Sequence, residues 1–116
     1  MRADSVARIS QMRKGAVELA TLGLLAKGEL YGVEIVDSLS ALPGLAVTAG
    51  TVYPLLSRLK KAGLLDSAWR ESSAGPPRKY YRLTPEGRRS LDDLTCVWRE
   101  MSDAVETLLA EVSVDV

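Results

Sequence analysis

The chain has 116 residues, of which 47% are hydrophobic and 26% are charged, as in one ordinary globular domain. It contains one cysteine, Cys96, and no histidine. This composition excludes an intrachain disulfide framework, a thiolate metal cluster and histidine-based catalysis, so we expect no enzyme activity, no metal and no cofactor.

The formal net charge is zero, but the charges are segregated along the chain. Residues 1–47 hold five Lys/Arg and five Asp/Glu, residues 48–89 hold nine against three, and residues 90–116 hold one against seven. The basic middle segment favours an anionic partner. No apolar run approaches the roughly 20 residues that cross a bilayer, and the start "MRADSVARISQMRKG" lacks a signal-peptide core. We therefore expect a cytoplasmic protein with no membrane partner.

Two helices are predicted in the first 42 residues. The segment 15–26, "GAVELATLGLLA", is apolar on nearly every face and predicts a buried helix. Apolar residues also recur every three positions in residues 1–13. This spacing favours further turns of helix, but whether the segment is helical stays open. The segment 31–42, "YGVEIVDSLSAL", predicts a second helix that ends at Pro43-Gly44. Its inward residues are expected to be Ile35, Val36, Leu39 and Leu42.

A third helix is predicted from Thr48, a good N-cap residue, to a stop at Gly63. Its apolar residues recur at spacings of three, four and seven, and are Val52, Leu55, Leu56 and Leu59. The other face is polar and basic, with Thr51, Tyr53, Ser57, Arg58, Lys60 and Lys61.

The stretch 69–87, "WRESSAGPPRKYYRLTPEG", predicts a hairpin with strands at about 64–71 and 78–84. We expect the tip to be residues 72–77, where a glycine allows a turn and two prolines fix φ. Tyr80 and Tyr81 must point to opposite sides of their strand, so at least one of them is structural. Trp69 is expected to pack beneath the hairpin.

The last predicted helix starts at Thr84-Pro85-Glu86, which supplies an N-cap, a proline at the first helical position and an acid beside the positive end of the dipole. About 27 residues follow with apolar side chains at alternating spacings of three and four. A seam of this kind needs a partner helix, and a second copy of the chain is the simplest one. The predicted dimer-interface residues are Leu91, Leu94, Trp98, Met101, Val105, Leu108 and Val112.

Three helices followed by a two-stranded hairpin predict an α+β, mostly α fold, a winged helix-turn-helix with a long C-terminal dimerisation helix. Residues 1–84 would form the DNA-binding domain with its N-terminal extension, and residues 85–116 the dimerisation helix. In this fold the third helix enters the DNA major groove and the hairpin lies against phosphates. The predicted contacts with double-stranded DNA are Thr48, Thr51, Tyr53, Ser57, Lys60, Arg78, Lys79 and Arg82.

Three stretches make the chain similar to a known family. They are "TLGLLAKGELYGVEI", "GTVYPLLSRLKKAGLL" and "GPPRKYYRLTPEG", and together they resemble the PadR family of bacterial transcriptional regulators. The resemblance implies a dimeric repressor, usually released from its operator by an effector. It also implies that Trp98 could stack on a flat aromatic effector, whereas simple packing in the dimer core is the alternative. A winged-helix protein-interaction module that does not bind DNA is the rival function.

Overall fold

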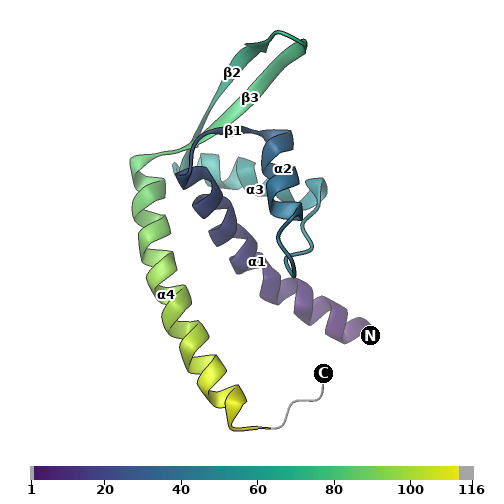
Figure 1. Ribbon diagram of the computed structural model, residues 1–116, viewed down its shortest axis with the longest axis vertical. Helices are drawn as coiled ribbons and strands as arrows, with labels where there is room; N and C mark the ends of the chain where they lie inside the picture. Colours follow the sequence, from purple (N-terminus) through teal and green to yellow (C-terminus); the bar gives the residue numbers. More distant parts are fainter. Residues whose placement is uncertain (1, 113–116) are drawn as a thin grey trace.

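The computed structural model describes residues 2–112, which form four helices and a three-stranded sheet (Figure 1). In chain order the elements are α1 (Ala3–Ala26), β1 (Leu30–Tyr31), α2 (Gly32–Ser40), α3 (Ala49–Lys61), β2 (Leu65–Ser72), β3 (Gly75–Leu83) and α4 (Pro85–Ala110). This order confirms the winged-helix prediction, with β2 and β3 as the wing. Within residues 2–112, no helix combines the length and the apolar character that a membrane span needs.

The helix α1 settles the question left open for the first residues, because it runs without interruption from Ala3. Its second half enters the core through Val17, Leu22 and Leu25. Thr21 is also fully buried, and its hydroxyl donates to the carbonyl oxygen of Val17 at 2.8 Å, which satisfies the only polar side chain on this stripe. The first half of α1 extends beyond this core.

The helices α2 and α3 supply most of the remaining core. Ile35 and Leu39 of α2 are fully buried, as predicted, and α3 contributes its four predicted apolar residues, Val52, Leu55, Leu56 and Leu59. Two expectations for α2 were wrong. Leu42 is 45% exposed, because α2 ends at Ser40 before another turn could bring it inward. Tyr31 does not lie within the helix, since Leu30–Tyr31 forms the short strand β1.

The sheet has the strand order β1-β3-β2, and all its pairings are antiparallel. The predicted hairpin is confirmed, but its tip is tighter than expected. Ser72 pairs with Gly75, so only two residues connect the strands, and Pro76 and Pro77 lie in β3. The register shifts at this point, with one residue of β2 opposite the two prolines. A bulge accommodates residues that have no N–H to donate to the ladder.

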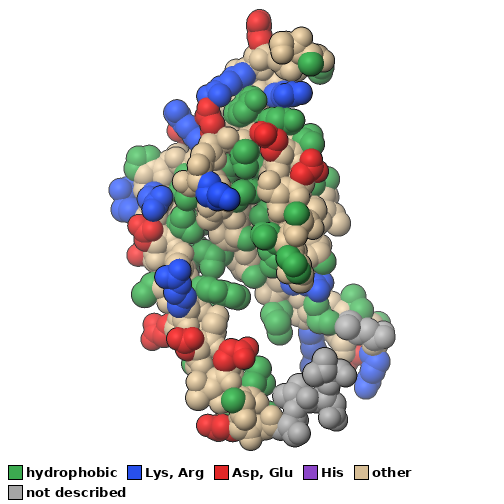
Figure 2. All heavy atoms as spheres, viewed as in Figure 1, with side chains coloured by type: hydrophobic (Ala, Val, Ile, Leu, Met, Phe, Trp, Pro, Cys, Tyr) green, Lys and Arg blue, Asp and Glu red, His purple; other side chains and the backbone are tan. Residues whose placement is uncertain are grey.

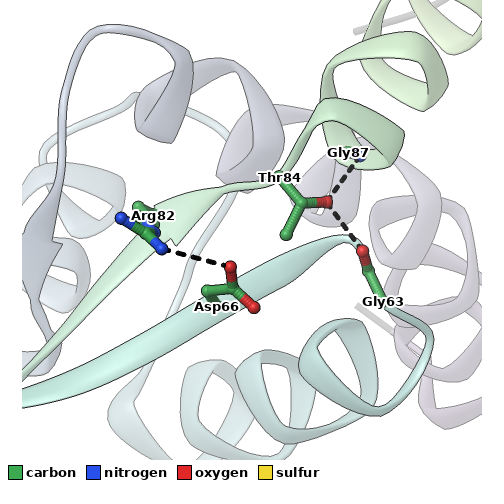
Figure 3. A network of polar contacts seen from close by, with 5 residues as sticks. All are labelled: Gly63, Asp66, Arg82, Thr84 and Gly87. Carbon is green, nitrogen blue, oxygen red and sulfur yellow. Dashed lines mark hydrogen bonds and ion pairs between the residues drawn. The ribbon is translucent and has the colours of Figure 1, made fainter.

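Thr84 joins the wing, α3 and α4 (Figure 3). Its hydroxyl donates to the carbonyl oxygen of Gly63 at 2.7 Å and accepts from the backbone N–H of Gly87 at 3.0 Å. Its own N–H donates to the carbonyl oxygen of Leu64 at 3.1 Å. The predicted N-cap is therefore confirmed, with Pro85 in the first turn of α4. The three hydrogen bonds of Thr84 also fix the direction in which α4 leaves the wing.

The helix α4 begins beside α1 and diverges from it toward its C-terminal end (Figure 1). Leu91 packs against the chain's own core, whereas the later seam residues are exposed, up to 61% at Leu108. Val112 lies beyond the end of α4 at Ala110. On the face seen in Figure 2, acidic side chains gather along the lower part of α4. The structure thus leaves an apolar seam uncovered in the single chain.

Tyr81 is expected to make the fold less stable at alkaline pH. Burial in the core, with a smaller contribution from the nearby Tyr53, raises the pKa of Tyr81 above its ordinary value of 10.0. The folded chain then holds this proton more tightly than the unfolded chain, so the stabilisation is complete below about pH 10 and is lost as the pH rises through the folded pKa. We expect the urea midpoint to fall between about pH 9 and about pH 11, and to fall less in Tyr81→Phe. Equal falls in the two proteins would contradict this role.

Candidate nucleic-acid interface

The helix α3 presents an exposed face with two edges. Because one turn takes 3.6 residues, positions seven apart lie almost directly above one another. Thr51 and Arg58 therefore share one edge, Tyr53 and Lys60 share the other, and Ser57 lies between them. All five side chains are exposed. The buried stripe on the opposite side of α3 holds this face outward.

Thr48 occupies the predicted N-cap position of α3, but its side chain does not cap the helix. The hydroxyls of Thr48 and Thr51 instead lie 3.3 Å apart, so they bond to each other. This pair places two hydroxyl groups side by side at the exposed start of α3. Both groups can contact a phosphate or a base edge by exchanging this bond for one to DNA.

A groove of about 620 Å³ separates the wing from α2 and α3. Tyr53 enters it from α3, and Trp69, Lys79 and Tyr81 enter it from the strands. The ring of Tyr53 lies over Gly32 at the start of α2, where an added Cβ would stand 2.7 Å from Tyr53 Cε1. The groove thus brings one edge of the α3 face and the wing together, and Gly32 is required for the close approach of the ring.

The two adjacent wing cations, Arg78 and Lys79, point to opposite faces of β3, as neighbouring strand residues must. Lys79 is paired with Trp69 in the register, and its Nζ lies 5.9 Å from the Trp69 ring centre and 5.7 Å from that of Tyr81. The Cζ of Arg78 lies 4.5 Å from the ring centre of Tyr31. Aromatic rings therefore hold each cation through cation–π contacts.

A row of side chains on the Arg78 face ties the wing to β1. The rings of Tyr31 and Tyr80 meet edge to face at 5.6 Å, and Arg70 Cζ lies 4.7 Å from the Tyr80 ring centre. Arg70 in turn forms an ion pair with Glu29. Glu29 offsets the charge of Arg70, so this arginine adds less to the positive field of the wing than Arg78 does.

Arg82 lies near the base of the wing, where one of its guanidinium nitrogens is 3.5 Å from Asp66 Oδ2 (Figure 3). It was predicted as a DNA contact together with the other wing cations. The structure places it away from the tip and beside an acid. Of the three predicted wing cations, Arg78 and Lys79 line the groove that faces α3, and Arg82 does not.

Comparisons with known proteins agree with this geometry. The model of the transcriptional regulator PadR-like family matches residues 21–93. The chain belongs to the PadR-like family of transcriptional regulators. Transcriptional regulator Rv3488 of Mycobacterium tuberculosis is 39% identical over 83 residues, which cover 72% of this chain and 76% of that protein.

Solved structures show the same fold. A PadR-like transcription factor from Bacteroides fragilis is 44% identical, with a TM-score of 0.71, over 85% of this chain and 95% of that one. A PadR family transcriptional regulator from Eggerthella lenta is 36% identical, with a TM-score of 0.78, over 90% of this chain and 91% of that one. The family and the winged-helix fold inferred from the sequence are both confirmed.

Trp69 of this PadR-like regulator lies elsewhere than predicted, and Arg58 lies beside the predicted residues of α3. Trp69 was expected beneath the wing but is 68% exposed, because its ring lies on the groove side of β2 beyond the end of the core. Arg58 was seen on the polar face of α3 but was not counted as a contact. Its position seven residues after Thr51 puts it on the same edge of α3 as Thr51. Tyr81, in contrast, is buried and is the structural tyrosine of the predicted pair.

Proposed function

We propose that the chain acts as a homodimeric transcriptional repressor that binds an inverted repeat in double-stranded DNA. The supporting observation is the groove that sets Tyr53, at one edge of the exposed face of α3, beside Arg78 and Lys79 of the wing. The helix α3 then enters the major groove, where Thr51, Ser57 and Lys60 meet base edges and phosphates. A bacterial regulator that binds DNA acts in the cytoplasm, which is the compartment we propose for this protein.

The wing contributes mainly electrostatic affinity. Lys79, Trp69 and Arg78 all line the groove beside α3, although Arg78 lies on the opposite face of β3 from Lys79. Lysine and arginine that neutralise phosphates release counterions, so affinity falls as salt concentration rises. The bulge and the two prolines limit the conformational freedom that the tip loses on docking.

Replacing Arg78 and Lys79 together with Ala is expected to weaken binding to all DNA sequences about equally. Each lost phosphate contact makes the negative slope of log affinity against log salt shallower by about 0.9, so the slope of the double variant should be shallower by about two. Fluorescence anisotropy in a salt series measures this slope. Arg8→Ala with Arg99→Ala removes two exposed cations of α1 and α4 that do not line this groove, and serves as the control with the same change in net charge.

Variants of α3 should behave differently from variants of the wing. Replacing Ser57 or Lys60 should change the preference among DNA sites by about 1–3 kcal/mol where the side chain reads a base. A wing double variant with an unchanged salt slope would refute the phosphate role of Arg78 and Lys79.

The dimer is built on the exposed seam of α4. A hydrophobic stripe with a heptad spacing forms a stable contact when a second helix covers it. Two-fold symmetry then places two α3 helices on the same side of the duplex, with half-sites about 10 base pairs apart or a multiple of that distance. Acidic side chains along α4 keep this part of the dimer off the DNA.

Trp98 is the proposed site of an effector. Its ring lies on the seam and is 46% exposed in the single chain, so it can line a cleft between two subunits. We expect flat aromatic compounds to quench Trp98 fluorescence and to weaken operator binding, and Trp98→Ala to remove the quenching while the dimer persists. Trp69 contributes background, which the Trp98→Ala variant measures. If such compounds change neither signal, Trp98 belongs to the dimer core alone.

A further inference from the structure

A second groove lies on the other edge of α3. It encloses about 820 Å³ between the first half of α1, the loop before α3, and α3 itself. Among the residues 2–112 that line it, the cations are Arg13, Lys14 and Arg58, and none is an Asp or a Glu. The whole chain has equal numbers of acidic and basic residues, so a groove with three cations and no acid is a local concentration of positive charge.

These cations remain available to an external anion. Lys14 and Arg58 are exposed, and neither takes part in an ion pair among the residues that the structure describes. Arg13 is held by its Nε, which donates to the carbonyl oxygen of Gly44 at 2.9 Å. Within the described part of the chain, that bond leaves the other guanidinium nitrogens of Arg13 without a partner, and it fixes the loop before α3 against α1.

The groove and the wing lie on opposite edges of the same helix. Thr51 and Arg58 line this groove, whereas Tyr53 lines the groove of the wing. A helix with its side chains is about 10–12 Å across and the major groove is about 12 Å wide, so both edges of a bound helix meet sugar-phosphate backbone. The wing can reach the backbone on one edge only.

We propose that Lys14 and Arg58, with Arg13 beside them, bind backbone phosphates on the edge of α3 opposite the wing. This inference rests on the proposed function and extends the DNA interface to α1. Backbone phosphates fit these groups because an exposed lysine or arginine with no acid beside it can neutralise a phosphate charge. The wing and this cluster would then hold α3 in the major groove from both edges.

The test compares Lys14→Ala and Arg58→Ala with Arg8→Ala. Arg8 is an exposed cation of the same helix α1 that does not line the groove, so it controls for the change in net charge. We expect each of the first two variants to make the negative slope of log affinity against log salt shallower by about 0.9, for operator and unrelated DNA alike. Arg8→Ala should leave the slope unchanged, and Lys14→Arg should restore it.

Circular dichroism and sedimentation should show that all variants remain folded and keep the assembly state of the unmodified chain. If Lys14→Ala and Arg58→Ala match Arg8→Ala while the wing double variant gives a shallower slope, the second phosphate site is refuted and the proposed function stands. If the unmodified chain binds no DNA at any salt concentration, the proposed function itself fails. A shallower slope of log affinity against log salt in both groove variants supports the proposal.

Discussion

Replacing Gly87 with Ala is expected to unfold the protein or to lower its free energy of unfolding by at least about 3 kcal/mol. Gly87 is buried in the first turn of α4, directly against the start of β2. An added Cβ would collide with the carbonyl oxygen of Leu64 and lie 2.8 Å from Leu83 Cδ1. Backbone cannot move aside as a flexible side chain can, so α4 would be forced away from the wing.

Gly23→Ala is the matched control for this prediction. Gly23 lies within α1, and an added Cβ there would meet no atom within 4 Å. Alanine favours a helix over glycine by about 0.5–1 kcal/mol, so this variant should be slightly more stable than the unmodified chain. Urea unfolding followed by circular dichroism measures both. A Gly87→Ala protein with an unchanged urea midpoint would show that the junction between the wing and α4 is looser than the structure describes.

The double variant Leu94→Asp with Leu108→Asp is expected to abolish the dimer. Both side chains are exposed in the single chain, so charges at these positions cost the isolated fold little. In a dimer they would lie in an apolar contact, where unpaired carboxylates are strongly unfavourable. Sedimentation should therefore show a monomer, an unfolded chain or both, and DNA affinity should fall because two half-sites are no longer bound together.

Cys96→Asp with Ala110→Asp adds the same two charges to α4 and controls for them. These residues fall opposite the seam in the heptad, and both are exposed. The control protein should remain a dimer at micromolar concentration. Sedimentation of the unmodified chain as a folded monomer, or identical behaviour of the two double variants, would contradict an interface on the seam.

Local sequence patterns predicted most of this fold because most of its elements are marked by residues within or next to them. Helical spacing identified the core of α3, and Thr84-Pro85 marked the start of α4 within one residue. The strand β1 has only two residues and forms through pairing with Tyr80 and Tyr81, some fifty positions away, so nothing near Leu30–Tyr31 signals it. Such pairings depend on how the helices bring distant segments together.

The candidate site was predictable where it follows from periodicity alone. Strand alternation places Arg78 and Lys79 on opposite faces, and helix periodicity gives the two edges of α3. Spacing could not show that Arg70 is paired with Glu29 or that Arg82 lies beside Asp66, since each pair joins separate segments. Trp69 was misplaced because the wing extends beyond the core that would have covered it. Charge segregation pointed to the segment that holds α3 and the wing without these pairings.

Footprinting of the unmodified protein on the DNA upstream of its own gene tests the central claim most directly. The account predicts two protected half-sites of an inverted repeat, about 10 base pairs apart or a multiple of that, with protection lost as salt concentration rises. Protection of a single isolated half-site would contradict the symmetric dimer. No protection on that or any other fragment, at low salt and micromolar protein, would contradict DNA binding itself.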